Sequence, residues 1–413
     1  MTEPNMTEAN MSDFIDENFA REVALLKALV RVPSDNPPGN CVPHAERAEA
    51  LLTALGFVVE RHPVPHHLVE ATGMRSVMNL VIRERFGNGK GPVIALNAHG
   101  DVVPPGQGWK TDPYGAIEKA GAVYGRGAAV SKSDFATYAF ALLALKAAPA
   151  GLDGTVELHL TYDEEAGGTV GPQWLLAQNI SKPDLAISAG FSYAVITAHN
   201  GVLHLEVTVH GRQAHAAMPQ TGADALEAAT SVLAALYTER KKLTKRKSKM
   251  AGIGSPTLNV GMISGGINTN VVPDKIAMRI DRRLIPEENG RAVEKSLNGL
   301  IARAGKRKDI KIEIRRIMLA EPLKPRPGID RLVAPLVRNA KREFKTAIPV
   351  KGVPLYTDAR HYSAAGIPTV LYGAGPRTIL EANAHGANEH IRLSDLKSAT
   401  KVIAATLRDL LRS

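Results

Sequence analysis

The sequence predicts an α/β fold: a doubly wound, mostly parallel sheet forms a catalytic domain, and a ferredoxin-like α+β domain is inserted into it. Two observations predict this fold. Short apolar, β-branched segments alternate with helical segments, as in βαβ units. The middle of the chain then follows the order β-α-β-β-α-β. We therefore expect a catalytic domain over 1–196 and 318–413, and a lid or dimerisation domain over 197–317.

Periodicity and turn residues assign the elements of the catalytic domain. The expected strands cover 56–60, 78–82, 92–98, 156–161, 185–187 and 368–372. The expected helices cover 12–32, 44–55, 133–148, 329–344 and a C-terminal segment capped near Ser394. Ser133 is expected to cap its helix, and the first ten residues are expected to be a disordered tail.

The inserted domain shows alternating strands and two helical segments. The expected strands are 202–209, 257–263, 275–284 and 310–317, and the expected helices are 224–241 and 288–304. This order is that of a ferredoxin-like unit.

Composition limits the class of protein. With 413 residues, two to three domains are expected, and a hydrophobic fraction of 44% argues against disorder. No apolar run approaches the roughly 18 residues of a membrane span, so no membrane partner is expected. Cys41 is the only cysteine, and the N-terminus lacks the apolar segment of a secretory signal. These features predict a cytoplasmic protein without an intrachain disulfide.

The net charge of +10 raises the question of nucleic acid binding. Seven of the basic residues crowd into the segment 240–249, which has no interleaved aromatic residue. A solvated helix end explains this segment better than a binding surface. We expect no nucleic acid partner.

Polar side chains follow the predicted parallel strands, where doubly wound sheets bind ligands. His99 and Asp101 follow one strand, Glu164 and Glu165 follow another, and His385 comes after the last. Adjacent carboxylates repel each other, so a buried pair needs a partner such as a metal ion; a solvated acidic turn is the alternative. Histidine with carboxylate suits zinc, manganese or cobalt, and Asp101 is placed to fix the tautomer of His99.

In these segments the chain resembles the metal-dependent amidohydrolases that include aminoacylase, acetylornithine deacetylase, succinyl-diaminopimelate desuccinylase and carboxypeptidase G. The resemblance covers nearly the whole chain. It rests on nine segments in order: Asn97–Pro104, Gly108-Trp109 with Asp112–Tyr114, Tyr124–Ala129, Asp163–Gly168, Gly211–His215, Asn270–Pro273, Asp281–Arg283, Tyr356–Arg360 and His385–Glu389.

The resemblance implies a two-metal site with five protein ligands and a small-molecule substrate. It assigns His99 to the first metal, and Glu165 and His385 to the second. It makes Glu164 the general base that takes a proton from the attacking water, and Asp101 the residue that orients His99. The expected cofactor is one or two divalent transition metal ions, zinc in first place, with manganese or cobalt as alternatives.

The inserted domain contributes three further residues by the same resemblance. His215 would reach the active site of the partner in a homodimer and stabilise the oxyanion. Asn270 and Arg283 would hold the carboxylate or carbonyl of the substrate. The alternatives are a hairpin-turn residue for His215 and a surface salt bridge for Arg283.

Two positions depart from the family pattern. Val130 stands where the resemblance expects an aspartate that bridges both metals, and Ser188-Ala189-Gly190 stands where it expects another carboxylate. Asp134, one helical turn beyond Val130, is a conceivable substitute, although an acid in the first turn of a helix is also expected from the helix dipole. Further candidates for a substitute ligand are Ser131, Asp101 and His199.

Two functions follow from these residues. The first is a metal-dependent hydrolase that cleaves a C–N amide-type bond in a small N-acyl amino acid, dipeptide or related carboxylate-bearing compound, with Glu164 as the base. Three protein ligands and a water suffice for catalytic zinc. The alternative is a relative with a degenerate metal site that binds without hydrolysis or acts on an atypical substrate.

Overall fold

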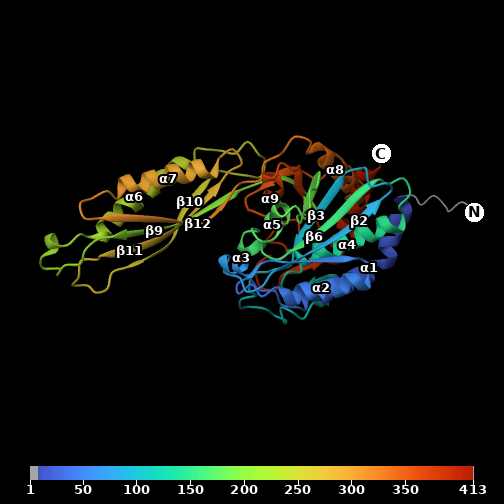
Figure 1. Cartoon of the computed structure of the whole chain (residues 1–413), viewed down its shortest axis with the longest axis horizontal. Coiled ribbons are helices and arrows are strands. Elements are labelled where there is room, and N and C mark those ends of the chain that lie inside the picture. The colour runs from blue at the N-terminus through green and yellow to red at the C-terminus, as the bar shows by residue number, and fades with distance from the viewer. Residues whose placement is uncertain (1–7, 413) are drawn as a thin grey trace, which may run out of the picture. The chain divides into compact units, whose positions relative to one another are not determined.

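The computed structural model describes residues 8–412 and divides into two compact units, drawn in Figure 1. The first unit comprises the chain up to Thr197 together with Pro325–Lys351 and Thr357–Ser413. The second comprises Ala198–Lys324 and Gly352–Tyr356. Residues 1–7 of the predicted disordered tail lie outside the described residues, whereas residues 8–10 already belong to the first helix.

An eight-stranded sheet forms the centre of the first unit, in the order β1-β2-β6-β3-β7-β14-β8-β13. The central strands β6-β3-β7-β14 are parallel, while β1 and β2 on one side and β8 on the other pair antiparallel. The predicted α/β sheet is confirmed, with parallel pairing confined to its centre. Its strands are β1 (Val59–Pro63), β2 (Met78–Phe86), β3 (Val93–His99), β6 (Gly154–Thr161), β7 (Leu185–Ser188), β8 (Val195–His199), β13 (Val350–Val353) and β14 (Thr369–Leu371).

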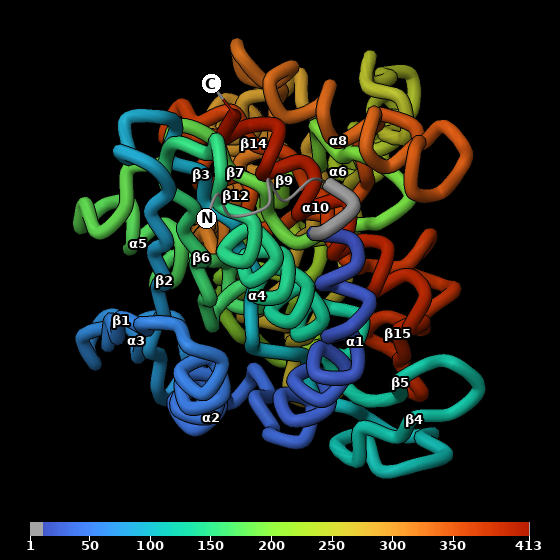
Figure 2. Tube along the Cα trace, turned by 90° about the vertical axis from the view of Figure 1, so that its right-hand side faces the viewer, coloured from blue at the N-terminus to red at the C-terminus, as the bar shows by residue number. Residues whose placement is uncertain are grey.

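Helices cover both faces of this sheet. Successive residues of β3 point to opposite faces: Ile94 and Leu96 join the main apolar core, whereas Ala95 packs in a smaller cluster with Tyr362 of α9. Figure 2 shows α1, α4 and α10 beside one another on the face of the main core. The helices are α1 (Glu8–Val30), α2 (Val42–Ala54), α3 (His66–Ala71), α4 (Lys132–Ala147), α5 (Pro172–Ala177), α8 (Asp330–Phe344), α9 (Ala359–Ala364) and α10 (Leu393–Leu411).

Helix α4 is the most deeply buried helix of the first unit, because α1 and α10 both pack on it. Its N-cap is Ser131 and not the predicted Ser133, which lies inside the helix. The Ser131 hydroxyl makes no capping bond, because it exchanges hydrogen bonds with the backbone N–H and C=O of His99 instead. The start of α4 is therefore tied to the end of β3.

A small antiparallel sheet, β15-β5-β4, joins two distant parts of the first unit. It contains β4 (Ile117–Lys119), β5 (Ala122–Tyr124) and β15 (His390–Arg392). His390 lies opposite Tyr124, and the N–H of Gly125 donates to the C=O of Glu389. The segment that carries His385 is thereby held against the loop that leads into α4.

The second unit has the ferredoxin-like topology that the sequence predicts. Its antiparallel sheet follows the order β10-β11-β9-β12, and the helices α6 and α7 pack on one face of it. Asp224 and Asn289 cap these helices with their side chains. The elements are β9 (Gly201–His210), α6 (Ala225–Leu243), β10 (Thr257–Gly265), β11 (Lys275–Leu284), α7 (Gly290–Ala304) and β12 (Lys311–Ala320). No helix in the described part of the chain has the length and apolarity required to cross a membrane.

Glu22 provides a test of the packing between α1 and α10. Burial raises its pKa from 4.5 to about 8, although the hydroxyl of Thr400 donates to it and Lys397 lies nearby. The folded protein therefore keeps a proton that the unfolded chain releases, and the free energy of unfolding falls as the pH rises from about 4.5 to about 8.

We expect Glu22→Gln to remove this pH dependence, because the amide oxygen still accepts from Thr400 but carries no charge. Urea unfolding should show the variant to be more stable than wild type by about 1–3 kcal/mol at pH 8 and nearly equal to it at pH 5. An unchanged difference between the two proteins across this pH range would contradict the assignment.

Candidate metal centre

The carboxyl ends of β3 and β6 bring three potential metal ligands together. These parallel strands end side by side at His99 and Thr161. His99, Glu164 and Glu165 each place one ligand atom within 4.8 Å of the other two. The geometry follows from the parallel sheet, because adjacent parallel strands present their carboxyl ends at the same edge.

Hydrogen bonds fix the orientation of the His99 ring. Its Nδ1 lies 2.9 Å from the backbone oxygen of Asp101 and 3.4 Å from the carboxylate Oδ1 of the same residue. A carbonyl oxygen only accepts, so Nδ1 carries the proton and Nε2 is left as the ligand atom of the neutral ring. Burial disfavours the charged ring, but Asp101, Glu164 and Glu165 together raise the pKa of His99 well above its ordinary value.

The Asp101 carboxylate also shapes the turn that carries both glutamates. It is fully buried and accepts hydrogen bonds from the backbone N–H groups of Glu164 (3.2 Å) and Glu165 (3.1 Å), and from Asn36 Nδ2 (3.0 Å). The turn is a short 3₁₀ helix, Glu164–Ala166, which ends at Gly167 with a φ of 108°. Glycine adopts this left-handed conformation without strain.

Glu164 has the electrostatic character of a general base. Desolvation raises its pKa to about 7; the positive charge of His99 opposes this shift, and the charge of Glu165 adds to it. A base whose pKa lies near neutral pH accepts a proton efficiently at that pH.

Glu165 forms an ion pair with His385. Its Oε1 lies 3.3 Å from His385 Nε2. The hydrogen bond to Glu165 and the charges of Glu165 and Glu164 raise the pKa of His385, against the effect of burial. The structure thus brings His99, Glu164 and Glu165 together, with His385 beside Glu165.

Further carboxylates lie beneath the same turn. Asp163 and Asp358 are buried, and burial raises the pKa of Asp163 to about 7 and that of Asp358 well above its ordinary value. The charge of Asp101 adds to the shift of Asp163, the charge of Asp163 adds to that of Asp358, and the guanidinium of Arg360 lowers both pKa values. The carboxylates around the cluster therefore outnumber the cationic groups that lower their pKa values.

The buried pair of Arg126 and Glu389 is a structural element that the sequence reasoning did not single out. Arg126 Nη1 binds Glu389 Oε2, and Glu389 Oε1 accepts from the N–H groups of Ala129 (3.0 Å) and Val130 (3.1 Å). Arg126 Nη2 also donates to the C=O of His385 at 3.3 Å. This pair holds the His385 segment against the loop that precedes α4. Both residues lie in segments that carry the family resemblance, and this resemblance is the sequence signal that could have identified them.

The positions that depart from the family pattern carry no ligand side chain. Val130 contributes its backbone N–H to Glu389, and the Ser131 hydroxyl is bound to the backbone of His99. A Cβ atom on Gly190 would lie 2.8 Å from the backbone of Leu371 and Tyr372, which leaves no room for a side chain there. His199 is the last residue of β8, at the point where the chain passes into the second unit, and its Nδ1 lies 2.8 Å from the C=O of Asn200.

Three predicted site residues belong to the second unit, where the structure gives their local contacts. His215 is exposed, and its Nδ1 accepts from the N–H of Ala217. Asn270 is exposed, and its C=O accepts from the N–H of Ala216. Arg283 makes a two-pronged ion pair with Asp281, with both distances at 3.0 Å.

The residues of the cluster fit a divalent transition metal. One imidazole and two carboxylates converge within 4.8 Å, and a second imidazole adjoins them. The Oε1 atom of Glu165 is buried and faces His385 Nε2 at 3.3 Å. Such nitrogen and oxygen donors are typical of zinc, manganese and cobalt sites.

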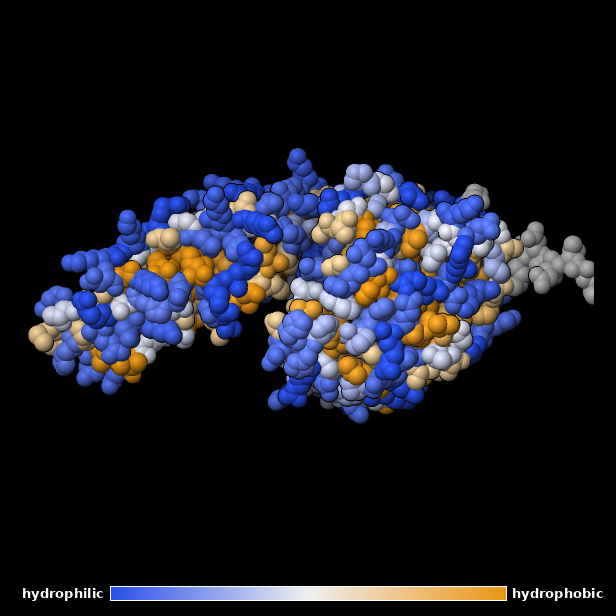
Figure 3. Space-filling model, viewed as in Figure 1, coloured by the Kyte–Doolittle hydropathy of each residue, from blue (hydrophilic) through white to orange (hydrophobic). Residues whose placement is uncertain are grey.

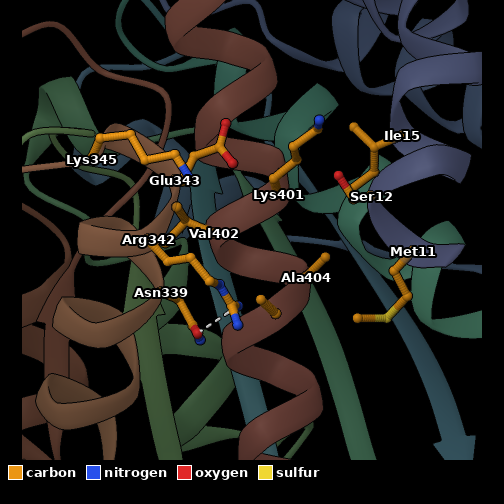
Figure 4. A pocket seen from close by; sticks show the side chains of 11 residues that line it. Met11, Ser12, Ile15, Asn339, Arg342, Glu343, Lys345, Lys401, Val402 and Ala404 are labelled. Carbon is orange, nitrogen blue, oxygen red and sulfur yellow. Dashed lines mark hydrogen bonds between the residues drawn. The ribbon is translucent and has the colours of Figure 1, made fainter. Parts of the chain in front are cut away.

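A separate pocket lies between α1, α8 and α10, and Figure 4 shows its lining. Lys401 there is already paired with Asp16 at 2.6 Å. The lining residues contain none of the strand-end residues described above. This pocket is therefore distinct from the candidate centre.

Comparison with known proteins gives a family match over most of the chain. Residues 95–409 match the sequence model of peptidase family M20/M25/M40. The chain is 28% identical over 399 residues to a succinyl-diaminopimelate desuccinylase of Granulibacter bethesdensis, covering 93% of this chain and 97% of that protein.

Two solved structures show the same fold. An M20 family metallo-carboxypeptidase, Sso-CP2 from Sulfolobus solfataricus, is 19% identical with a TM-score of 0.74 and covers 96% of this chain and 99% of its own. The YXEP protein of Bacillus subtilis, described as a dinuclear metal-binding peptidase of the M20 family, is 16% identical with a TM-score of 0.69 and the same coverage.

The Arg126–Glu389 pair gives a testable consequence. Removing one partner of a buried ion pair leaves the other charge uncompensated, so Glu389→Ala should lower the free energy of unfolding by about 3–5 kcal/mol. Glu118→Ala is the control, because its ion pair with Lys27 (3.1 Å) lies at the surface and should contribute about 0–1 kcal/mol. Urea unfolding measures both. Equal losses in the two variants would show that the buried pair does not stabilise the fold.

Proposed function

We propose, from the premise that this chain belongs to peptidase family M20/M25/M40, that it hydrolyses the C–N bond of small N-acyl amino acids or related carboxylate-bearing compounds. The chain is a hydrolase of the type that its relatives represent. The observation that carries the finer proposal is the convergence of His99, Glu164 and Glu165 at the edge of the sheet, with His385 beside them.

The residues divide the chemical work as follows. His99, Glu165 and His385 would hold the metal, which when bound polarises the scissile carbonyl and lowers the pKa of the attacking water. Glu164 accepts the proton of that water and then delivers it to the leaving nitrogen. Its pKa of about 7 suits both steps. Asp101 acts as a positioning residue, because it holds His99 and the turn that carries Glu164.

The second unit would supply contacts to the substrate and the oxyanion. His215 is proposed as a donor to the tetrahedral oxyanion, and Asn270 and Arg283 as contacts for the carboxylate or carbonyl of the substrate. Asp281 already accepts from Nε and Nη2 of Arg283. A substrate carboxylate would therefore have to compete with Asp281 for this residue.

The alternative function is binding without hydrolysis, or action on an atypical substrate. The observation in its favour is that Val130 and the stretch Ser188-Ala189-Gly190 contain no carboxylate where the resemblance expects two. Metal content separates the two functions. Purified protein that neither contains nor takes up zinc, manganese or cobalt would support the alternative.

We also propose that the protein forms a homodimer through the second unit. Strand β10 is an edge strand, and edge strands readily pair with another chain. It exposes Met262 (61%) and Ile263 (52%), and Figure 3 shows apolar side chains on the surface of this unit. A second copy of β10 would cover these side chains.

Glu164→Gln tests the proposed base. The amide keeps the size of the side chain but cannot accept the proton, so kcat on N-acetyl or N-succinyl amino acids should fall by about 100-fold or more. Zinc content, measured by mass spectrometry, should stay close to that of wild type, because Glu164 is not one of the proposed ligands. Unchanged activity in this variant would remove Glu164 from the mechanism.

Ile263→Lys tests the proposed dimer. A charge on the edge strand opposes pairing between copies, so light scattering should report a dimer for wild type and a monomer for the variant. The neighbouring Met262→Gln is a milder second variant. A monomeric wild type at micromolar concentration would contradict the proposal.

A further inference from the structure

Asp134 is a buried carboxylate that the mechanism above does not use. It lies in the first turn of α4 and is 1% exposed. Its Oδ1 accepts a hydrogen bond from the N–H of Ala374 at 2.8 Å, and no cationic side chain is paired with it among the described residues. A buried carboxylate held by one neutral donor lacks full compensation for its lost hydration.

The carboxylate of Asp134 lies at the carboxyl ends of β7 and β14. Ala374 follows β14, which runs parallel to β7 with Leu371 opposite Ser188. A Cβ atom on Gly373 would lie 1.9 Å from Asp134 Oδ1 and 3.2 Å from the backbone nitrogen of Gly190. Glycine at 373 thus leaves the space that the carboxylate fills, close to the backbone of Gly190.

The start of α4 holds Asp134 close to the end of β3. In the parallel pair of β3 and β7, Asn97 lies opposite Ser188. The N–H of Ala189 continues this ladder by donating to the C=O of Asn97 at 2.8 Å. β7 ends at Ser188, and at His99 the Ser131 hydroxyl instead bonds to the backbone N–H and C=O, while the C=O of Ser131 accepts from the N–H of Asp134 at 2.9 Å. The electrostatics agree, because burial raises the pKa of Asp134 to about 7 while the charge of His99 lowers it.

Gly190 cannot itself provide the carboxylate that the family resemblance expects in this stretch. Its Cβ would lie 2.7 Å from Leu371 Cβ and 2.8 Å from the backbone carbon of Leu371 and the nitrogen of Tyr372. A side chain there would push β7 and β14 apart. Any carboxylate at this place must therefore come from another element, and α4 is the element that supplies one.

We propose that Asp134 supplies a carboxylate ligand to a divalent cation on the His99 side of the cluster, in place of the ligands that Val130 and the stretch Ser188-Ala189-Gly190 do not provide. This inference rests on the proposed function, since it extends the same metal centre. Imidazole nitrogen from His99 and carboxylate oxygen from Asp134 form a donor set suited to zinc, manganese or cobalt. The metal centre would thereby take a ligand from position 134 in α4, whereas the resemblance expects an aspartate at position 130.

Asp134→Asn separates a ligand from a purely structural residue. The amide oxygen can still accept from the N–H of Ala374, but it is a much weaker ligand because it is uncharged. Zinc affinity, measured by competition with a chromogenic chelator, should fall by about 10-fold or more, while the urea midpoint of the metal-free protein should not fall. Asp134→Ser, with a smaller side chain, is the second variant if the amide is not tolerated.

Two comparison variants make the outcome decisive. Glu22→Gln removes a buried carboxylate from the interface of α1 and α10 and should leave zinc affinity unchanged. Glu165→Gln removes a ligand of the proposed function and should weaken zinc binding strongly. Unchanged affinity in Asp134→Asn together with loss in Glu165→Gln would overturn the role of Asp134 and leave the proposed function intact. A wild-type protein that binds no zinc would overturn both.

Discussion

The buried carboxylate of Asp101 is the interaction on which the site depends. It accepts from the backbone N–H groups of Glu164 and Glu165 and from the side chain of Asn36. The same residue fixes the ring of His99. One charge thus joins the ends of β3 and β6, and such hydrogen bonds to a buried charge are both strong and specific in geometry.

The cost of this arrangement is an excess of negative charge. The charge of Asp101 adds to the raised pKa values of Asp163 and Glu164, and these two residues in turn raise the pKa of Asp358. The positive groups nearby are two histidines and Arg360. A divalent cation would neutralise part of this excess. The same divalent cation would therefore balance charge in the fold and serve the proposed chemistry.

Most of the architecture could be predicted from the sequence, because it follows from local patterns. Alternation of apolar residues predicted β9 and β11 almost to the residue, and apolar runs predicted β3, β6 and β7. The parallel arrangement then predicted that His99 and the glutamate pair would meet. His385 required the family resemblance, since no strand pattern leads directly to it.

The remainder depends on contacts that no local pattern encodes. Strands of three to five residues such as β5, β8 and β15 are too short to show a period, and their pairing comes from tertiary contacts. Arg126 and Glu389 are 263 residues apart. Ser131 rather than Ser133 precedes α4, because the backbone of His99 holds its hydroxyl. Nor could the sequence show why two glycines lack side chains. Gly190 leaves space for the backbone of Leu371 and Tyr372, and Gly373 leaves space for the carboxylate of Asp134.

The central claim is that the strand ends of the first unit form a metal centre of altered ligand set. Anomalous diffraction from crystals soaked in zinc tests it most directly. The account predicts an anomalous peak, measured at the zinc absorption edge, between His99, Glu165 and His385 and on the side of Asp134. Soaked crystals with no peak at these residues would contradict the account.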